Sequence, residues 1–436
     1  MAPASGPMGS GGAGSTAAAS YWALAVLFIV NVFNQGDRML FGVVVEPIRR
    51  DLLLSDTSIS LISGLFFVLF NLLAGLFLAR AIDRGNRVRI LALGVLAWSL
   101  ATAAQGLAQG FWSLAAARIA VGIGEATAFP AVMSLIPDLF RAEARGRAVA
   151  VFQSSSFVGI VGGTVVAGVL GAALGWRSMF FVCGLAGLGA AALLVLTVPE
   201  PKRSDGEEAE LVPEAYLSGM VKAALRVLKL PGLPALLVGL GFAAMMTFVL
   251  ASWGPAFLLR SHGVPLAEVG LVIGPSVGIG GILGTIISGI AADVLVRRRG
   301  HASAMLLVPM VTVPLALPFM AAFILAPSLL WAMLSAACMN ALLSAALPPS
   351  MNFAVNGAAT RDRAMVSTML LAAMGLIGGS LGPFLVGMLS DRLAAEHGAE
   401  SLRMAMTAML VVPVLASVCL TFAWRHARGG ASHPAA

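Results

Sequence analysis

The stretch ARAIDRGNRVR, residues 79–89, has a counterpart in GIAADVLVRRR, residues 289–299. Both stretches follow a long apolar run, and both carry an aspartate a few positions before two or more arginines. A second pair of similar stretches, RGRAVAVF at 145–152 and RDRAMVST at 361–368, each leads to a pair of glycines. The members of the two pairs are about 210 and about 216 residues apart, so two unrelated landmarks repeat at nearly one distance. The chain is therefore expected to consist of two related halves.

The composition places these halves in a membrane. Of the 436 residues, 59% are hydrophobic and 11% are charged, whereas a soluble domain has about 25% charged residues. The formal net charge of +7 does not indicate nucleic-acid binding, because the basic residues are scattered through short loops and form no single basic face. Cys183, Cys338 and Cys419 lie far apart inside apolar runs, so neither a disulfide framework nor a metal site is expected.

Twelve apolar runs are long enough to cross a bilayer, which takes about 20 residues. Six precede and six follow the only long polar interruption, which covers residues 201–232. We expect an all-α membrane protein with twelve transmembrane helices in two pseudo-symmetric six-helix bundles. The approximate limits of the runs are 22–48, 58–80, 88–108, 111–138, 147–172, 177–198, 233–260, 266–292, 303–325, 328–349, 362–390 and 402–424.

The polar segments divide the chain into five parts. We expect, in order, a flexible cytoplasmic tail, an N-terminal bundle, a cytoplasmic linker, a C-terminal bundle and a second cytoplasmic tail, over residues 1–20, 21–199, 200–232, 233–425 and 426–436. In the linker, VKAALRVLKL places Lys222, Arg226 and Lys229 on one helical face opposite apolar residues. This pattern is typical of a helix lying on a membrane surface, and a plain linker helix fits it equally well. Residues 1–20 have neither the basic start nor the apolar core of a cleavable signal peptide.

The distribution of lysine and arginine predicts the orientation of the chain. With the N-terminus inside, the cytoplasmic segments hold about 19 of these residues, the outer segments about 6, and the spans only Arg38 and Arg118. Cytoplasmic loops are the ones enriched in basic residues. Both termini of this multi-pass protein are therefore expected in the cytoplasm.

Each of the two basic residues inside the spans shares its span with an acidic residue. Asp37 precedes Arg38 in NQGDRML, residues 34–40, and Glu125 follows Arg118 in RIAVGIGEA, residues 118–126. A helix rises about 1.5 Å per residue, which places all four charges about 10 to 20 Å from the outer ends of the first and fourth spans. Arg118 and Glu125 share one helix face, and Asn34, Asp37 and Arg38 share another. We therefore expect one cluster of two acids and two bases.

Two interpretations of this cluster are open. Paired charges can simply lock two helices together, since buried ion pairs do not by themselves imply function. Alternatively, the cluster switches a proton, because a carboxylate without water tends to take up a proton and a nearby guanidinium favours its ionised form. The corresponding positions of the second half, near Thr247, Leu334 and Asn340, are uncharged. This asymmetry favours proton coupling by Asp37, Arg38 and the two charges of the fourth span.

The loop after the second span of each half resembles the signature of the major facilitator superfamily, and RIAVGIGEA is similar to that superfamily's fourth-helix motif. Together with NxxDR in the first span and SWGPAFLLRSHGVPLAEVG at 252–270, these motifs look like bacterial relatives of the Spinster family over nearly the whole chain. The resemblance implies a monomeric carrier in a bacterial inner membrane. It also implies a conformational latch, closed in the outward-facing state, formed by Asp83, Arg84, Arg87, Gly289, Asp293, Arg297 and Arg298.

The leading functional prediction is a proton-coupled secondary carrier that works by alternating access. Carriers built from duplicated halves hold their substrate near the midplane, where the halves meet. We expect basic and neutral hydrogen-bonding groups and apolar bulk to line that place, from Arg38, Arg118, Asn34, Met246, Thr247, Trp253, Asn340 and Asn356. Such a lining suits an amphipathic anion, and the resemblance implies a lysolipid-like one. A small organic anion such as a sugar acid is the alternative, because carriers of such acids share GIGEA-like and FPA-like stretches.

An enzyme or an ATP-driven pump is not expected. The sequence has no GxxxxGK[ST] phosphate loop and no HExxH motif, and none of its five histidines falls within a span. No cofactor or metal is expected, and the expected partners are the substrate, protons and membrane lipid. A sensor or scaffold without transport activity is a third alternative, but it would not need acids inside the membrane.

Overall fold

The computed structural model describes residues 11–203 and 213–430, and every regular element in them is helical. The first half contains α1 (Gly11–Val43), α2 (Val45–Asp51), α3 (Asp56–Ser60), η1 (Leu61–Phe66), α4 (Phe67–Arg84), α5 (Arg87–Gln105), α6 (Phe111–Glu125), α7 (Ala128–Leu139) and α8 (Ala142–Thr197). Helix α9 (Pro213–Val227) lies in the linker. The second half contains α10 (Leu233–Ser261), α11 (Leu266–Arg299), η2 (Ala302–Leu306), α12 (Leu307–Ile324), α13 (Leu329–Ser344), α14 (Leu347–Asn356), η3 (Thr360–Asp362), α15 (Arg363–Ala373), η4 (Met374–Leu381), α16 (Gly382–His397), η5 (Gly398–Glu400), α17 (Ser401–Ala408), η6 (Met409–Val411) and α18 (Val412–Gly430).

The described helices make twelve membrane crossings, as the sequence predicts. Ten continuous helical stretches are long and apolar enough to cross a membrane, and two of them are far too long for one crossing. At about 1.5 Å per residue, the 56 residues of α8 extend well beyond the roughly 30 Å of a hydrocarbon core. Gly175 interrupts α8 with φ of 78°, and Gly398, with φ of 52°, interrupts the 69-residue stretch Thr360–Arg428. Each of these two stretches is therefore a pair of crossings.

Several segment ends differ from the sequence prediction, among them both ends of the first crossing and the C-terminal end of the last one. Helix α1 already begins at Gly11, although a tail was expected up to residue 20, because three alanines at 17–19 are strong helix formers that extend the span. The first crossing ends at Val43 and not at residue 48, since Val44 leaves helical geometry and starts the separate helix α2. Helix α18 continues to Gly430, past the expected end at 425. Residues 1–10 and 431–436 of the expected tails lie outside the described residues.

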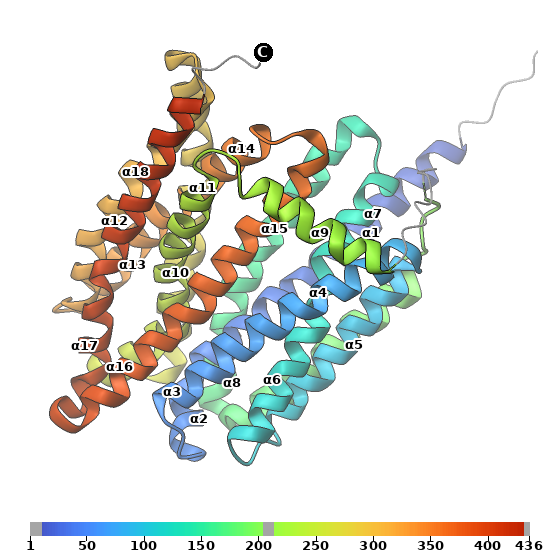
Figure 1. Cartoon of the computed structure of the whole chain (residues 1–436). Helices are drawn as coiled ribbons and strands as arrows, with labels where there is room; N and C mark the ends of the chain where they lie inside the picture. The colour runs from blue at the N-terminus through green and yellow to red at the C-terminus, as the bar shows by residue number, and fades with distance from the viewer. Residues whose placement is uncertain (1–10, 204–212, 431–436) are drawn as a thin grey trace, which may run out of the picture.

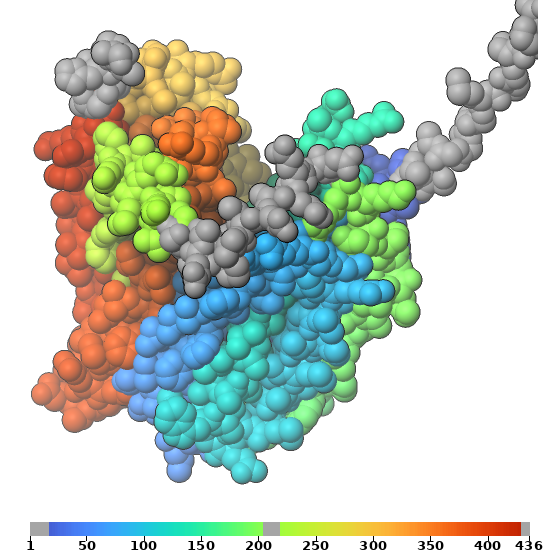
Figure 2. All heavy atoms as spheres, turned by 45° about the vertical axis from the view of Figure 1, so that its right-hand side comes forward, coloured from blue at the N-terminus to red at the C-terminus, as the bar shows by residue number. Residues whose placement is uncertain are grey.

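The two halves are joined at one end of the bundle and parted at the other. We call the end with both described termini and the arginine-rich loops the basic end, and it lies at the top of Figure 1. Towards the basic end, each half has its own apolar core. At the opposite end a single core combines Phe41 and Ile48 of the first half with Leu250 and Phe257 of the second. Figure 2 shows the corresponding notch between the halves at the basic end.

Glycines allow close helix contacts both between the halves and within them. A Cβ atom at Gly270 of α11 would overlap with the carbonyl oxygen of Thr164 in α8, which belongs to the other half. A Cβ atom at Gly284 would overlap equally with the carbonyl oxygen of Ala341 in α13, which belongs to the same half. Small residues let membrane helices approach to this distance. The same type of contact thus fixes one half internally and seals the two halves together.

This difference predicts distinct effects of two alanine substitutions. Gly284→Ala forces α11 and α13 apart and should lower stability by about 1 to 3 kcal/mol, seen as a lower melting temperature. Gly270→Ala should instead open the end opposite the basic end. The measurement is the distance between spin labels at the exposed positions Leu53 and Glu396, obtained by double electron–electron resonance. The native cysteines are replaced by serine so that only these two positions carry a label. Gly75→Ala is the control, because no atom lies within 4 Å of a Cβ there. Equal label distances in Gly270→Ala and the parent would contradict the sealing role.

Candidate functional site

A break in the fourth crossing presents Glu125. Helix α6 ends at Glu125, and α7 resumes at Ala128 after a two-residue turn. Gly122 and Gly124 press the end of α6 against its neighbours, since a Cβ there would lie 2.9 Å from the carbonyl oxygen of Phe67 and 2.8 Å from the amide nitrogen of Trp98. The side-chain amide of Asn71 donates to the carbonyl oxygen of Gly122 at 2.8 Å. The glycines of RIAVGIGEA thus fix the carboxylate at a helix end deep in the first half.

Arg38 forms the ion pair of the site. Its Nε donates to Oε2 of Glu125 at 2.7 Å, which joins the first crossing to the fourth. The Glu125 side chain is fully buried, whereas 35% of the Arg38 side chain is exposed. The other carboxylate oxygen of Glu125 has no hydrogen-bond partner among the described residues. The pair therefore connects a buried acid to a base that solvent or a ligand can reach.

Arg118 is held by aromatic rings. Its guanidinium carbon lies 4.5 Å from the centroid of the Phe67 ring and 5.2 Å from that of Phe41, within the range of cation–π attraction. The residue is 2% exposed, and its Nε and Nη1 atoms have no hydrogen-bond partner among the described residues. Arg118 thus supplies a positive charge near Glu125 without a direct ion pair to it in the described part of the chain.

Asp37 points to a different neighbour than the sequence suggested. The hydroxyl of Thr102 in α5 donates to Oδ2 of Asp37 at 2.5 Å, and Oδ1 has no described partner. Adjacent residues on a helix point about 100° apart, so Arg38 reaches α6 while Asp37 faces α5. Of the four charges expected in one cluster, Arg38 and Glu125 form the described ion pair, and Asp37 instead accepts a hydrogen bond from the Thr102 hydroxyl. Thr102 was missed because a threonine in an apolar helix gives no sign of its partner.

Apart from the buried Arg118, the predicted substrate residues fall into three groups. Arg38 is partly exposed, Thr247 is half-buried, and Asn34 is 4% exposed with an unpartnered amide nitrogen one turn before Arg38. Met246 and Trp253 are buried in the shared core, and the Trp253 indole donates to the carbonyl oxygen of Pro383 at 3.0 Å. These two residues are packing residues in this conformation. The last group comprises the buried Asn340, which donates to the carbonyl oxygen of Val277 at 2.6 Å, and the exposed Asn356, near the basic end.

The predicted latch residues are not equivalent. Arg87 is 2% exposed and binds Asp138 at 2.5 Å within the first half and Glu200 at 2.7 Å at the start of the linker. On α11, Nε of Arg297 donates to the carbonyl oxygen of Asp293 at 3.4 Å within the same helix. A Cβ at Gly289 would meet nothing within 4 Å. Of the remaining predicted members, Asp83, Arg84 and Arg298 are exposed at the basic end, where the halves are parted.

A buried charge network that sequence analysis missed joins the halves at the opposite end. Arg260 of α10 binds Glu46 at 2.6 Å and Asp56 at 2.7 Å, both from the first half. Asp391 of α16 accepts hydrogen bonds from the backbone amides of Asp56 and Thr57 at 3.0 and 2.8 Å. We call these residues the opposite-end lock. Arg260 falls in the stretch 252–270 that resembles the Spinster family, and Glu46 falls in the first predicted run, but nothing in the sequence indicated that these residues are partners.

Glu46, one member of the lock, stays charged over a wide pH range. Glu46 lies in α2, beyond the end of the first crossing. Burial by itself would raise the pKa of Glu46, but hydrogen bonds from Arg49 and Arg50 and the charges of Arg260 and Arg49 outweigh it and lower that pKa to about 2. Its contribution to the lock is therefore present above the ordinary carboxyl pKa of 4.5 and is lost only as the pH falls through about 2.

Two six-helix halves that are joined at one end and parted at the other, with charges buried between crossings, define a membrane transporter and not an enzyme. The sequence profile of the Major Facilitator Superfamily matches residues 27–383, and the chain belongs to this family. An MFS-type efflux pump of Mycolicibacterium smegmatis is 31% identical over 398 residues, which is 91% of each chain. A probable galactarate/D-glucarate transporter of Bacillus subtilis, GudP, is 28% identical over 312 residues, or 66% of this chain and 67% of that one.

The fold also matches a solved Spinster relative. The crystal structure of a bacterial homologue of the human lysosomal transporter Spinster, in an inward-facing and unoccupied conformation, is 28% identical. The match covers 96% of this chain and 99% of that chain, with a TM-score of 0.85. The resemblance to Spinster relatives seen in the sequence motifs is thereby confirmed.

Proposed function

We propose that the protein is a proton-coupled carrier that moves a lysolipid-like or other amphipathic anion across the inner membrane by alternating access. The observation that carries this proposal is the ion pair between the partly exposed Arg38 and the buried Glu125. An anion that binds Arg38 competes with Glu125 for its only described ion-pair partner. A buried carboxylate without a counter-charge is costly, and taking up a proton removes that cost.

Arg118 and Asp37 support the same exchange. Arg118 has two unpartnered nitrogen atoms next to aromatic rings, so it can attract an anionic head group together with Arg38. Asp37, held by Thr102, is a second acid in the same part of the first half. With the basic end in the cytoplasm, as the positive-inside rule predicts, the parted halves open this site to the inside.

The relatives suggest both candidate substrates. The Spinster resemblance supports the amphipathic anion, and the similarity to GudP supports the alternative, a small sugar acid. One relative is named an efflux pump, so export is a candidate direction of transport as well as uptake, and both directions are tested. With either substrate, the carrier would bind the anion and a proton at the same time. The anion would pair with Arg38, and Glu125, without its ion-pair partner, would take up the proton.

The test is the movement of a fluorescent lysophospholipid across proteoliposome membranes, with pH gradients of both polarities and with glucarate as competitor. Glu125→Gln should abolish gradient-driven movement, because a glutamine cannot bind or release the proton. Glu143→Gln, which removes an exposed carboxylate at the basic end, is the matched control and should behave like the parent. Full gradient-driven movement in Glu125→Gln would disprove the coupling role. Movement of glucarate but not of the lysophospholipid would favour the sugar-acid alternative.

A further inference from the structure

Helix α9 and the turn that follows it present two separate exposed rows. The side chains of Ala223, Ala224 and Val227 are turned towards the protein and are at least half-buried. The exposed side chains follow i, i+4, i+7 spacing twice, so each set lies along one line of the helix. The apolar row is Val221, Leu225 and Leu228, and the basic row is Lys222, Arg226 and Lys229.

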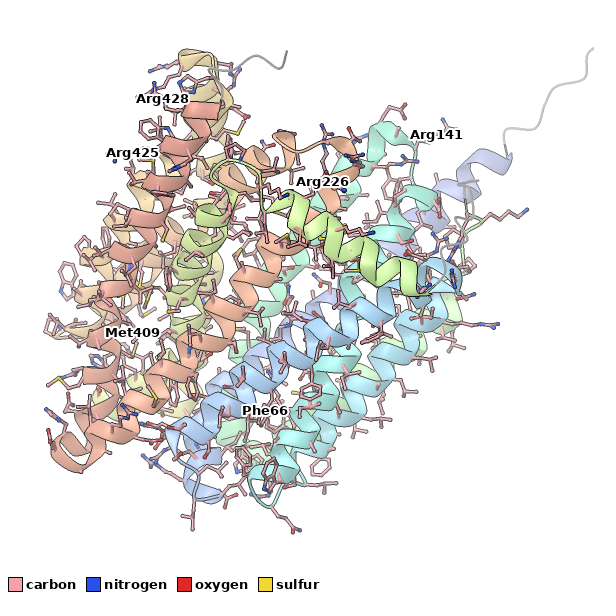
Figure 3. All side chains as sticks on the ribbon, in the orientation of Figure 1. Phe66, Arg141, Arg226, Met409, Arg425 and Arg428 are labelled. Atoms are coloured by element: carbon pink, nitrogen blue, oxygen red, sulfur yellow. The ribbon has the colours of Figure 1, made fainter. Side chains whose placement is uncertain are left out.

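The position of α9 is fixed by an ion pair. Arg226 binds Asp362, with Nη2 to Oδ1 at 2.5 Å and Nε to Oδ2 at 3.1 Å, and Asp362 directly precedes α15. Figure 3 shows Arg226 beside the end of α15, and Figure 1 shows α9 running across the crossings and not parallel to them. A helix that lies near the end of the crossings, runs across them and carries one apolar and one basic row has the geometry of a helix in a membrane interface.

An apolar cavity lies next to the basic row. Its volume is about 310 Å³, at the lower end of the range of about 300 to 1,000 Å³ for ligand pockets. Two arginine or lysine residues directly adjoin lining residues in sequence: Lys229 precedes Leu230, and Arg428 follows Ala427. Arg428 is exposed, with its guanidinium 4.8 Å from the ring of Trp424. The cavity is lined by Leu230, Pro231, Leu233, Phe353, Ala354, Gly357 and Ala427.

We propose that this place is a binding site for an anionic phospholipid of the leaflet on the basic end. The phosphate lies against Lys229 and Arg428, one acyl chain enters the cavity, and Lys222 continues the basic row along α9. Charge complementarity selects an anionic over a zwitterionic head group, because basic residues next to a membrane attract anionic lipid. The cavity selects a lipid over a soluble phosphate, since a soluble head group cannot fill an apolar space.

The site is distinct from the transport site. It lies between the turn that follows α9, the start of α10, α14 and α18, near the basic end, whereas Arg38 and Glu125 join α1 and α6. Only the assignment of the leaflet to the cytoplasm rests on the orientation in the proposed function. A bound lipid would connect the linker to both ends of the second half and so stabilise the folded carrier.

The experiment measures lipid binding to the whole carrier in detergent, by native mass spectrometry and by melting temperature. Phosphatidylglycerol, phosphatidylcholine and glycerol 3-phosphate are the three probes. The parent should retain phosphatidylglycerol and melt several degrees higher with it, and should respond at least tenfold more weakly to the other two. The double variant Lys222→Gln with Lys229→Gln should lose this preference. The control, Arg141→Gln with Arg299→Gln, also removes two exposed positive charges at the basic end and should keep it.

A second variant tests the cavity independently of charge. Ala427→Phe should fill the cavity and weaken retention of phosphatidylglycerol, whereas Val418→Phe, at a position on the same helix that is 62% exposed, should not. Equal retention of both phospholipids by the parent, or equal loss in the charge variant and its control, would overturn the proposal. Equal responses to glycerol 3-phosphate and phosphatidylglycerol would also overturn it. Because the readout is binding, these results do not depend on transport activity.

Discussion

Replacing Arg260 with glutamine is expected to release the end of the carrier opposite the basic end. The substitution leaves Glu46 and Asp56 as buried carboxylates without the arginine that joins them to the second half. Breaking a buried ion pair in this way costs about 3 to 5 kcal/mol. A difference of 1.4 kcal/mol changes an equilibrium tenfold, so the balance between the two conformations should shift by about a hundredfold or more. The distance between spin labels at Leu53 and Glu396, measured by double electron–electron resonance, should increase.

Arg49→Gln is the matched control for this experiment. Arg49 also binds Glu46, at 3.0 Å, and lies 3.6 Å from Asp56, but all three residues belong to the first half. Removing it takes away a similar contact without cutting the connection between the halves. A lengthened distance of the same size in Arg49→Gln would show that the loop has been disturbed and that the lock does not hold the halves together.

The same labels test which charges respond to pH. Because the pKa of Glu46 is lowered to about 2, this member of the lock should not change its charge between pH 5 and pH 8. Any change in label distance over that range should therefore come from other groups, and under the proposed function it should disappear in Glu125→Gln. A pH response that persists in Glu125→Gln but is lost in Arg260→Gln would assign the switch to the lock.

Replacing Arg87 with glutamine is expected to lower the stability of the first half strongly. Arg87 is among the largest fully buried side chains of the described protein and binds Asp138, Glu200 and the carbonyl oxygens of Ser134 and Pro201. Its loss removes the guanidinium that pairs with one buried and one partly buried carboxylate, which should cost about 3 to 5 kcal/mol. The measurement is the melting temperature of the purified carrier. Arg89→Gln, two positions along and exposed, should melt like the parent.

Arg87 and Arg260 make similar ion pairs, but their replacement by glutamine is expected to have different effects, on stability for Arg87 and on conformation for Arg260. Both are buried arginines that each bind two carboxylates. The partners of Arg87 lie within its own half and at the first residue of the linker that follows it, and none lies in the second half. The ion pairs of Arg87 are therefore expected in every arrangement of the two halves. The partners of Arg260 lie in the other half, so its energy is present only while the opposite end is closed. A melting temperature of Arg87→Gln close to that of the parent would contradict this distinction.

Much of the fold could be predicted because bilayer physics acts locally along the chain. A crossing needs about 20 apolar residues, and this requirement identified the twelve crossings and the linker helix region before any contact was known. The cost of intramembrane charge likewise marked Asp37, Arg38, Arg118 and Glu125. The helical rise placed them at one depth, and the structure brings Arg38 and Glu125 into contact. The errors were at segment ends, where alanines 17–19 extend a helix that the hydropathy pattern ends.

The sequence by itself determined which stretches are long and apolar enough to cross a membrane, how the landmarks of the two halves repeat, and which charges lie inside those stretches, because each of these depends on composition and on the regular geometry of one helix. Only the tertiary structure decided that Glu125 pairs with Arg38, that Asp37 turns to Thr102, and that Arg260 holds the halves together. Those choices depend on how each helix is rotated against neighbours that lie 65 to 214 positions away in the chain. No local pattern records such a rotation, since it is set by the packing of all the helices at once.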